Sequence, residues 1–145
     1  MSETSDKLKI LLCNSYTLYL KTQNYHWHVK GPNFKSLHEL FEQQYTELAT
    51  AIDNIAERIR MLGEIAPASF DDFSKYRTLK DGNSNLASND MLKELHTDHL
   101  LVVDLLNETL ALVSNLNDEG TAALLSERTS AHEKMAWMLD SSLSV

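Results

Sequence analysis

Four side chains able to bind a transition metal follow one another at intervals of 12, 15 and 4 residues: His26, His38, Asp53 and Glu57. Imidazole nitrogens and carboxylate oxygens are suitable ligands for iron, and also for zinc or manganese. Asp53 and Glu57 are four residues apart, so on a helix their side chains share one face. The set is therefore a candidate metal site. The alternative is that the two carboxylates form a solvated helical face, with Glu57 paired to Arg60.

The spacing of His38 and Asp53 limits how such a site can form. The two residues lie 15 positions apart on what we expect to be one continuous helix. They would be separated by about 60° around the helix axis but by roughly 22 Å along it. No single ion can contact both within one chain. Either they belong to unrelated sites, or an antiparallel second copy brings its Asp53 and Glu57 beside His38, forming a dimer with two equivalent sites.

The elements that position these residues are expected to be helices. The 145 residues include only 4 glycines and 2 prolines, which favours a few long helices over many short strands. Apolar residues recur at helical spacing in four stretches, about 4–29, 34–63, 90–116 and, after the break at residues 117–120, from there to about 142. Gly31-Pro32 ends the first stretch. Asn33 is the expected cap of the second, and Ser88 or Asn89 the expected cap of the third.

The connection between the second and third stretches, from Glu64 to Asn89, is too long for a simple loop. Residues 70–76 within it are able to form a short helix. Two long hairpins joined by one long crossover define the ferritin-like version of the four-helix bundle. We therefore expect a single all-α domain over residues 1–145, with a short extra helix in the crossover between long helices two and three.

Composition excludes several classes of protein. No apolar run is long enough for a membrane span, and no signal peptide is visible, so we expect a cytoplasmic protein. The single cysteine, Cys13, excludes an internal disulfide and is expected to be a small buried residue. The formal net charge is −8, and the lysines and arginines are dispersed without a basic tail. This charge disfavours binding to nucleic acid.

Residues 24–61 closely resemble the ferroxidase segment of the Dps proteins, the miniferritins that protect bacterial DNA during starvation and oxidative stress. The resemblance is carried by Tyr-His-Trp at 25–27, Lys-Gly-Pro-Asn-Phe at 30–34, Leu-His-Glu at 37–39, Asp53, Ala-Glu-Arg-Ile at 56–59, and a tryptophan in the last helix, Trp137. It implies a hollow shell of twelve subunits with tetrahedral symmetry. Each ferroxidase site would lie at a two-fold interface, with the two histidines from one subunit and the two carboxylates from its neighbour.

The resemblance also implies a reaction. Fe(II) would be oxidised, preferably by hydrogen peroxide, with up to two irons per inter-subunit site, and ferric mineral would be stored in the shell. Trp27 would lie beside the centre and quench a stray oxidising equivalent; the alternative is an aromatic core or interface residue. Glu42, one helical turn after His38, is a candidate for supporting the ligands or for weak outer coordination. Its alternative is an ordinary salt bridge.

The other histidines are interpreted without a metal role. His28 stands where the family often has asparagine, and it does not share a helical face with His26, so we expect a surface or interface residue. His96 and His99 form an i, i+3 pair that is able to bind zinc adventitiously, although an exposed polar face is the simpler interpretation. His132 is likewise expected to be exposed or at an interface.

Pores at the three-fold axes of the family shell are lined by carboxylates near the start of the last helix, which attract cations. The nearest candidates are Asp118, Glu119 and Glu127. Two other functions remain as alternatives. Many family members coat DNA, which would require the basic tails that this sequence lacks. The third alternative is a purely structural shell in which the metal ligands are idle.

Overall fold

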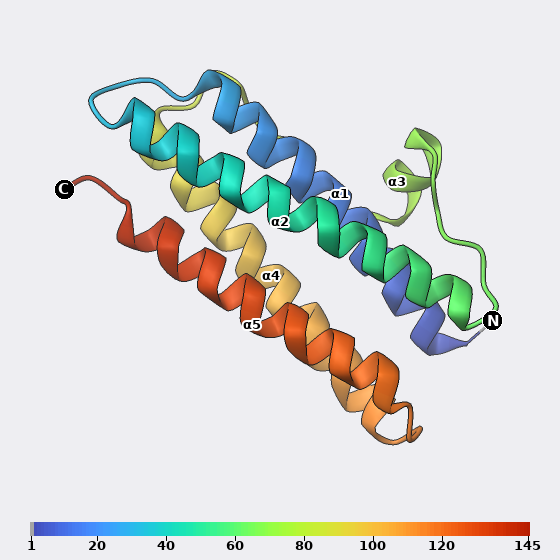
Figure 1. The fold of residues 1–145 in the computed structure, drawn as a ribbon. Coiled ribbons are helices and arrows are strands. Elements are labelled where there is room, and N and C mark those ends of the chain that lie inside the picture. Colours follow the sequence, from blue (N-terminus) through green and yellow to red (C-terminus); the bar gives the residue numbers. More distant parts are fainter. Residues whose placement is uncertain (1) are drawn as a thin grey trace.

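The computed structural model describes residues 2–145 and contains five helices within them. They are α1 (Glu3–His28), α2 (Phe34–Met61), α3 (Phe70–Tyr76), α4 (Ser88–Ser114) and α5 (Glu119–Ser141). Figure 1 shows α1 beside α2 and α4 beside α5, with the short α3 standing at the side of α1. The expected four-helix bundle with an extra helix in its crossover is therefore confirmed.

Ion pairs establish the direction of the helices. Lys21 on α1 contacts Asp98 on α4 at 2.7 Å, and Lys7 contacts Glu108 at 2.6 Å, so α1 and α4 are antiparallel. Because α1 and α2 form a hairpin, α2 and α4 run in the same direction. The connection between them must return along the length of the bundle, and α3 forms within that return (Figure 1).

Residues close by in the chain explain both ends of α1. The Ser2 side chain caps α1 by accepting from the Ser5 backbone N–H at 3.0 Å. The chain leaves α1 through Gly31, which has a positive φ of 112° that favours glycine, and Pro32 then prevents continuation of the helix. This tight corner places the last turn of α1 against the first turn of α2.

Neither expected side-chain capping bond forms. Asn33 is the N-cap residue of α2, as expected, but its side chain makes no capping bond. The expected cap of α4 is wrong, because α4 begins at Ser88 and its cap is Ala87 in place of Ser88 or Asn89. Both candidate amides are used elsewhere. Asn33 Nδ2 donates to Ser144 Oγ at 3.2 Å, while Asn89 donates to the Ser144 carbonyl and accepts from its N–H. Contacts with the C-terminal segment have replaced the local capping bonds.

The apolar core is formed by facing stripes of the four long helices. Its largest fully buried members include Leu18 on α1, Phe41 and Ile55 on α2, and Leu95 on α4. Burial of such side chains from water is the main source of stability in a bundle of this kind. Cys13 is also fully buried, as expected, and burial raises the pKa of its thiol to about 11. Within residues 2–145, no helix combines the length and hydropathy that a membrane crossing requires.

His99 was expected on an exposed polar face and His132 at the surface or at an interface, and both expectations are wrong because both residues are fully buried between α4 and α5. Their Nδ1 atoms are 2.9 Å apart, and the Arg128 guanidinium contacts His132 Nε2 at 3.0 Å. Since arginine can only donate, His132 Nε2 accepts, and its Nδ1–H donates to His99 Nδ1. His96, which was expected to share an exposed face with His99, is half-buried.

Arg128 connects the buried histidine pair to a more exposed carboxylate on α2. Its guanidinium also donates to both carboxylate oxygens of Glu47. Burial, together with the neighbouring Arg128 charge, lowers the pKa of His99 to about 3. The pKa of His132 is also lowered well below its usual value, mainly by burial. Both rings are therefore neutral core groups that join α4 to α5.

Candidate metal centre

His26 and His38 are brought together where α1 and α2 meet at their hairpin corner. Their rings are stacked, with centroids 3.7 Å apart and planes 11° from parallel. The Phe34 ring stacks on His38 at 5.0 Å. His26 is buried and His38 half-buried. The two residues that the sequence separates by 12 positions therefore form one compact pair in the fold.

Each imidazole of this pair is bonded to the backbone of the other residue. His26 Nδ1 donates to the His38 carbonyl at 2.7 Å, and His38 Nδ1 donates to the His26 carbonyl at 2.6 Å. A carbonyl can only accept, so both Nδ1 atoms carry the proton and both Nε2 atoms keep their lone pairs in the neutral rings. A metal-binding histidine is commonly oriented by such a bond from its other nitrogen.

The reciprocal bonds also satisfy a backbone carbonyl group at the C-terminal end of α1. The His26 carbonyl belongs to the last turn of α1, where carbonyl groups lack a partner within the helix. The His38 imidazole supplies that partner. The pair is thus fixed by backbone hydrogen bonding as well as by ring stacking, which makes its geometry a property of the hairpin itself.

Two further side chains of α2 lie against His26. The Tyr45 ring meets the His26 ring edge to face, with centroids 5.3 Å apart. Glu42 Oε1 is 3.7 Å from His26 Nε2, and the Glu42 side chain is 60% exposed. His38, Glu42 and Tyr45 recur at i, i+4 and i+7, so they share one stripe of α2. Glu42 was a candidate from the sequence, whereas Tyr45 was not, although this same spacing could have indicated it.

Asp53 and Glu57 lie farther along α2 and do not join the histidine pair. Both are exposed, and α2 is continuous from Phe34 to Met61, as the spacing argument requires. Among the residues that the structure describes, no three side chains of the His, Cys, Asp and Glu types cluster closely enough to hold a metal ion. A centre using both the histidines and the carboxylates would therefore need atoms from a second copy of the chain.

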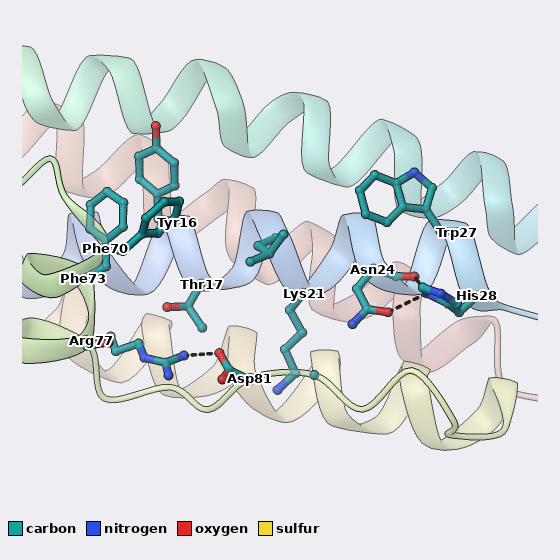
Figure 2. Close-up of a pocket in the computed structure, with 13 residues that line it drawn as sticks. Tyr16, Thr17, Lys21, Asn24, Trp27, His28, Phe70, Phe73, Arg77 and Asp81 are labelled. Carbon is teal, nitrogen blue, oxygen red and sulfur yellow. Dashed lines mark hydrogen bonds and ion pairs between the residues drawn. The ribbon is translucent and has the colours of Figure 1, made fainter.

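Trp27 and His28 lie at one end of a groove between α1 and the crossover. Figure 2 shows them at that end, with Tyr16, Phe70 and Phe73 at the other. Trp27 is 58% exposed. His28 is exposed as expected, and its Nδ1 is 2.8 Å from Asn24 Oδ1. The groove carries a large apolar aromatic surface that is open to solvent in a single subunit.

Of the three acidic candidates near the start of α5, Asp118 already has partners within the chain. Its carboxylate accepts from the Thr121 backbone N–H at 3.1 Å and from Arg58 Nη2 at 2.8 Å. Hydrogen bonds from Thr121, together with the Arg58 charge, hold the pKa of Asp118 below its usual value. Glu119 and Glu127 are exposed. Asp118 is thus a helix cap, which leaves the other two as the exposed carboxylates of this region.

Comparison with known families identifies the class of protein to which this helical bundle belongs. The family model described as the ferritin-like domain matches residues 5–145. Dps from Thermosynechococcus elongatus superimposes with a TM-score of 0.95 at 31% identity, covering 99% of this chain and 91% of that one. The fold is therefore ferritin-like over nearly the whole chain.

Two further relatives identify the family within the ferritin-like superfamily. A Dps protein from Vibrio cholerae O1, described as a member of a broad superfamily of ferritin-like diiron-carboxylate proteins, gives a TM-score of 0.92 at 32% identity over 96% of this chain and 87% of that one. DNA protection during starvation protein 2 of Bacillus anthracis is 36% identical over 122 residues, 84% of either chain. The chain belongs to the Dps family of the ferritin-like superfamily, which confirms the resemblance seen in residues 24–61.

Proposed function

We propose that this protein is an iron-oxidising and iron-storing miniferritin whose substrates are Fe(II) and hydrogen peroxide. The observation that carries the proposal is the reciprocal bonding of His26 and His38, which leaves two oriented Nε2 lone pairs at one corner of the subunit. Iron accepts such nitrogen donors together with carboxylate oxygens. The protein would consume peroxide while removing the ferrous iron that turns peroxide into damaging radicals.

The carboxylates complete the proposed site from a neighbouring subunit. Asp53 and Glu57 share an exposed face of α2, so an antiparallel two-fold pairing of α2 helices brings them to the partner's histidines. Anionic oxygen ligands stabilise Fe(III) more than Fe(II), and they therefore favour oxidation. Each interface would contain two such sites, and each site would accept up to two irons. Trp27 would lie at the same interface, where it could be oxidised in place of more sensitive groups.

The proposal extends to the assembly. Twelve subunits with tetrahedral symmetry would enclose a cavity in which ferric mineral is stored in the cytoplasm. Cations would enter near the start of α5, where Glu119 and Glu127 are exposed. The net charge of −8 suits an acidic inner surface. It also argues against the alternative of a DNA-coating protein, because phosphate binding depends on several cationic contacts. We expect no shift of plasmid DNA in a gel at neutral pH and about 0.1 M salt.

Stopped-flow oxidation of Fe(II) tests the proposed reaction, with peroxide and dioxygen compared as oxidants. The wild type is expected to oxidise iron faster with peroxide and to keep the ferric product soluble. The Asp53→Ala/Glu57→Ala double variant should fall to the rate of iron without protein. Asp104 and Glu108 form another exposed i, i+4 pair, on α4, so their double alanine variant is the matched control. Equal rates in the two double variants would contradict the proposal.

A further inference from the structure

The residues that follow α5 lie at the same end of the bundle as the corner between α1 and α2 (Figure 1). The Asn89 side-chain amide pairs there with both backbone groups of Ser144. Asn89 Oδ1 accepts from the Ser144 N–H at 3.0 Å, and Asn89 Nδ2 donates to the Ser144 carbonyl at 3.0 Å. Asn33 Nδ2 donates to the Ser144 hydroxyl at 3.2 Å. We call these three hydrogen bonds the Ser144 clasp, and they connect the start of α2 to the start of α4.

The clasp is adjacent to the histidine pair. Phe34 follows Asn33 directly in the chain, and its ring stacks on the His38 ring with centroids 5.0 Å apart. On its other contact, His38 stacks on His26 and donates from Nδ1 to the His26 carbonyl. The first turn of α2 is therefore held by α1 through His38 and by α4 through Ser144 and Asn33.

This first turn has less local support than those of the other three long helices. Side-chain bonds from Ser2 and Asp118 cap α1 and α5, and acidic residues stand in the first turns of α1, α4 and α5. Both features stabilise the N-terminal end of a helix. In α2 the cap residue makes no side-chain bond, and the first turn contains no acidic residue. Helix ends of this kind open readily, so the start of α2 depends on contacts with remote segments.

We propose that Asn89, Ser144 and Asn33 are positioning residues for iron, because they hold the first turn of α2 closed and thereby keep His38 bonded to His26. The proposal rests on the proposed ferroxidase function. When this turn opens, the His38 imidazole leaves the His26 carbonyl, and the two Nε2 atoms no longer form one site. Only the closed form offers both nitrogens, so the apparent affinity for Fe(II) falls in proportion to the closed fraction.

The same coupling operates in the reverse direction. A metal ion that binds only the closed form shifts the first turn of α2 toward closure, and it must stabilise the clasp by the same free energy by which the clasp favours the metal. Zinc accepts the same imidazole and carboxylate donors as iron. Because Zn(II) is not oxidised, it reports this coupling in the absence of any reaction.

Four variants of the full chain isolate the clasp. Asn89→Ala removes both bonds to the Ser144 backbone, and Ser144→Ala removes only the hydroxyl that accepts from Asn33. Ser144→Thr retains a hydroxyl and is the conservative replacement. Asn107→Ala, at an exposed asparagine of the same helix, is the matched control. Ser144→Thr and Asn107→Ala should behave as the wild type in every measurement.

Hydrogen–deuterium exchange, followed by mass spectrometry, measures opening of the first turn. In Asn89→Ala the peptide covering residues 33–41 should exchange about tenfold faster, the factor expected for one or two net hydrogen bonds. Ser144→Ala should show a smaller increase. Exchange in the middle of α4 and α5 should not change. Zn(II) should slow exchange of the 33–41 peptide in the wild type, and the residual opening in Asn89→Ala should decrease on the same addition.

Kinetics of Fe(II) oxidation by peroxide measure the consequence for iron. The Fe(II) concentration that gives half the maximal rate should rise at least about twofold in Asn89→Ala, the effect of a first turn that is open half of the time. The maximal rate should be retained, since saturating iron selects the closed form. A general loss of folded protein would instead lower the maximal rate and leave the half-saturating concentration unchanged.

The outcomes separate the clasp from the function on which it rests. If the wild type does not oxidise Fe(II) with peroxide, the proposed function fails, and the role in iron binding fails with it. If the wild type is active but Asn89→Ala has the wild-type half-saturating concentration, only the positioning role is overturned. Wild-type exchange of the 33–41 peptide in Asn89→Ala would also overturn it. So would faster exchange throughout the chain, which would assign the clasp to general stability.

Discussion

His26 and His38 orient each other, since each imidazole Nδ1 donates to the other residue's backbone carbonyl at 2.7 and 2.6 Å. One relationship therefore serves two purposes. It satisfies a carbonyl at the end of α1, and it fixes the tautomer in which Nε2 carries a lone pair. The structural role and the proposed metal-binding role can be separated experimentally, because the two would use different ring nitrogens.

Substitutions at His38 should separate these purposes. His38→Ala removes the donor to the His26 carbonyl, and leaving a partly buried acceptor without a partner costs about 1–3 kcal/mol. His38→Asn retains a donor near the position of Nδ1 but has no counterpart of Nε2. It should recover part of the stability while iron oxidation remains lost. Urea unfolding combined with Fe(II) oxidation rates measures both effects, and equal stability of the two variants would contradict the structural role of the bond.

Acid should destabilise the protein through the buried pair His99 and His132. The pKa of His99 is lowered to about 3 in the fold, against about 6.5 when unfolded, and that of His132 is lowered as well. Between these values the unfolded chain binds more protons, so stability falls as pH decreases below about 6.5. Each histidine contributes a slope of up to about 1.4 kcal/mol per pH unit. The pH dependence of the unfolding midpoint measures this, and His28→Gln, at an exposed histidine, should leave it unchanged.

Asp118 is expected to act on stability through its cap. Asp118→Ala removes the acceptor for the Thr121 N–H and the partner of Arg58, so the free energy of unfolding should fall by about 1–2 kcal/mol. Glu119→Ala, at the neighbouring exposed carboxylate, should change stability little. Thermal unfolding compares the two variants. If Asp118→Ala were as stable as the wild type but slow in iron uptake, a pore role would replace the capping role.

The sequence was informative wherever local spacing decides the structure. Helical periodicity located four long helices to within a few residues, and Gly31-Pro32 marked the corner that joins His26 to His38. The distance of Asp53 from His38 along one helix needed only the rise per residue. Such features depend on neighbours in the chain, and the structure confirms them.

Local spacing failed where the partner of a polar group is remote in sequence. His99 was expected to be exposed and His132 to be exposed or at an interface, yet the two rings contact each other in the core between α4 and α5. Their positions within apolar stripes could have indicated this, since Leu95, His99 and Val102 recur at core spacing. Asn33 is the N-cap residue of α2 and Asn89 was an expected cap of α4, but both side chains bind Ser144 near the end of the chain and cap no helix. No local pattern reveals such a partner.

Subunit complementation examines whether each iron site combines histidines from one chain with carboxylates from another. A His26→Ala/His38→Ala chain and an Asp53→Ala/Glu57→Ala chain are each expected to be inactive in Fe(II) oxidation with peroxide. Unfolded together and reassembled, they should regain activity, because one of the two sites in every mixed pair receives intact histidines and intact carboxylates. Sites formed within single chains, or unrelated to these residues, would leave the mixed assembly no more active than its separate components.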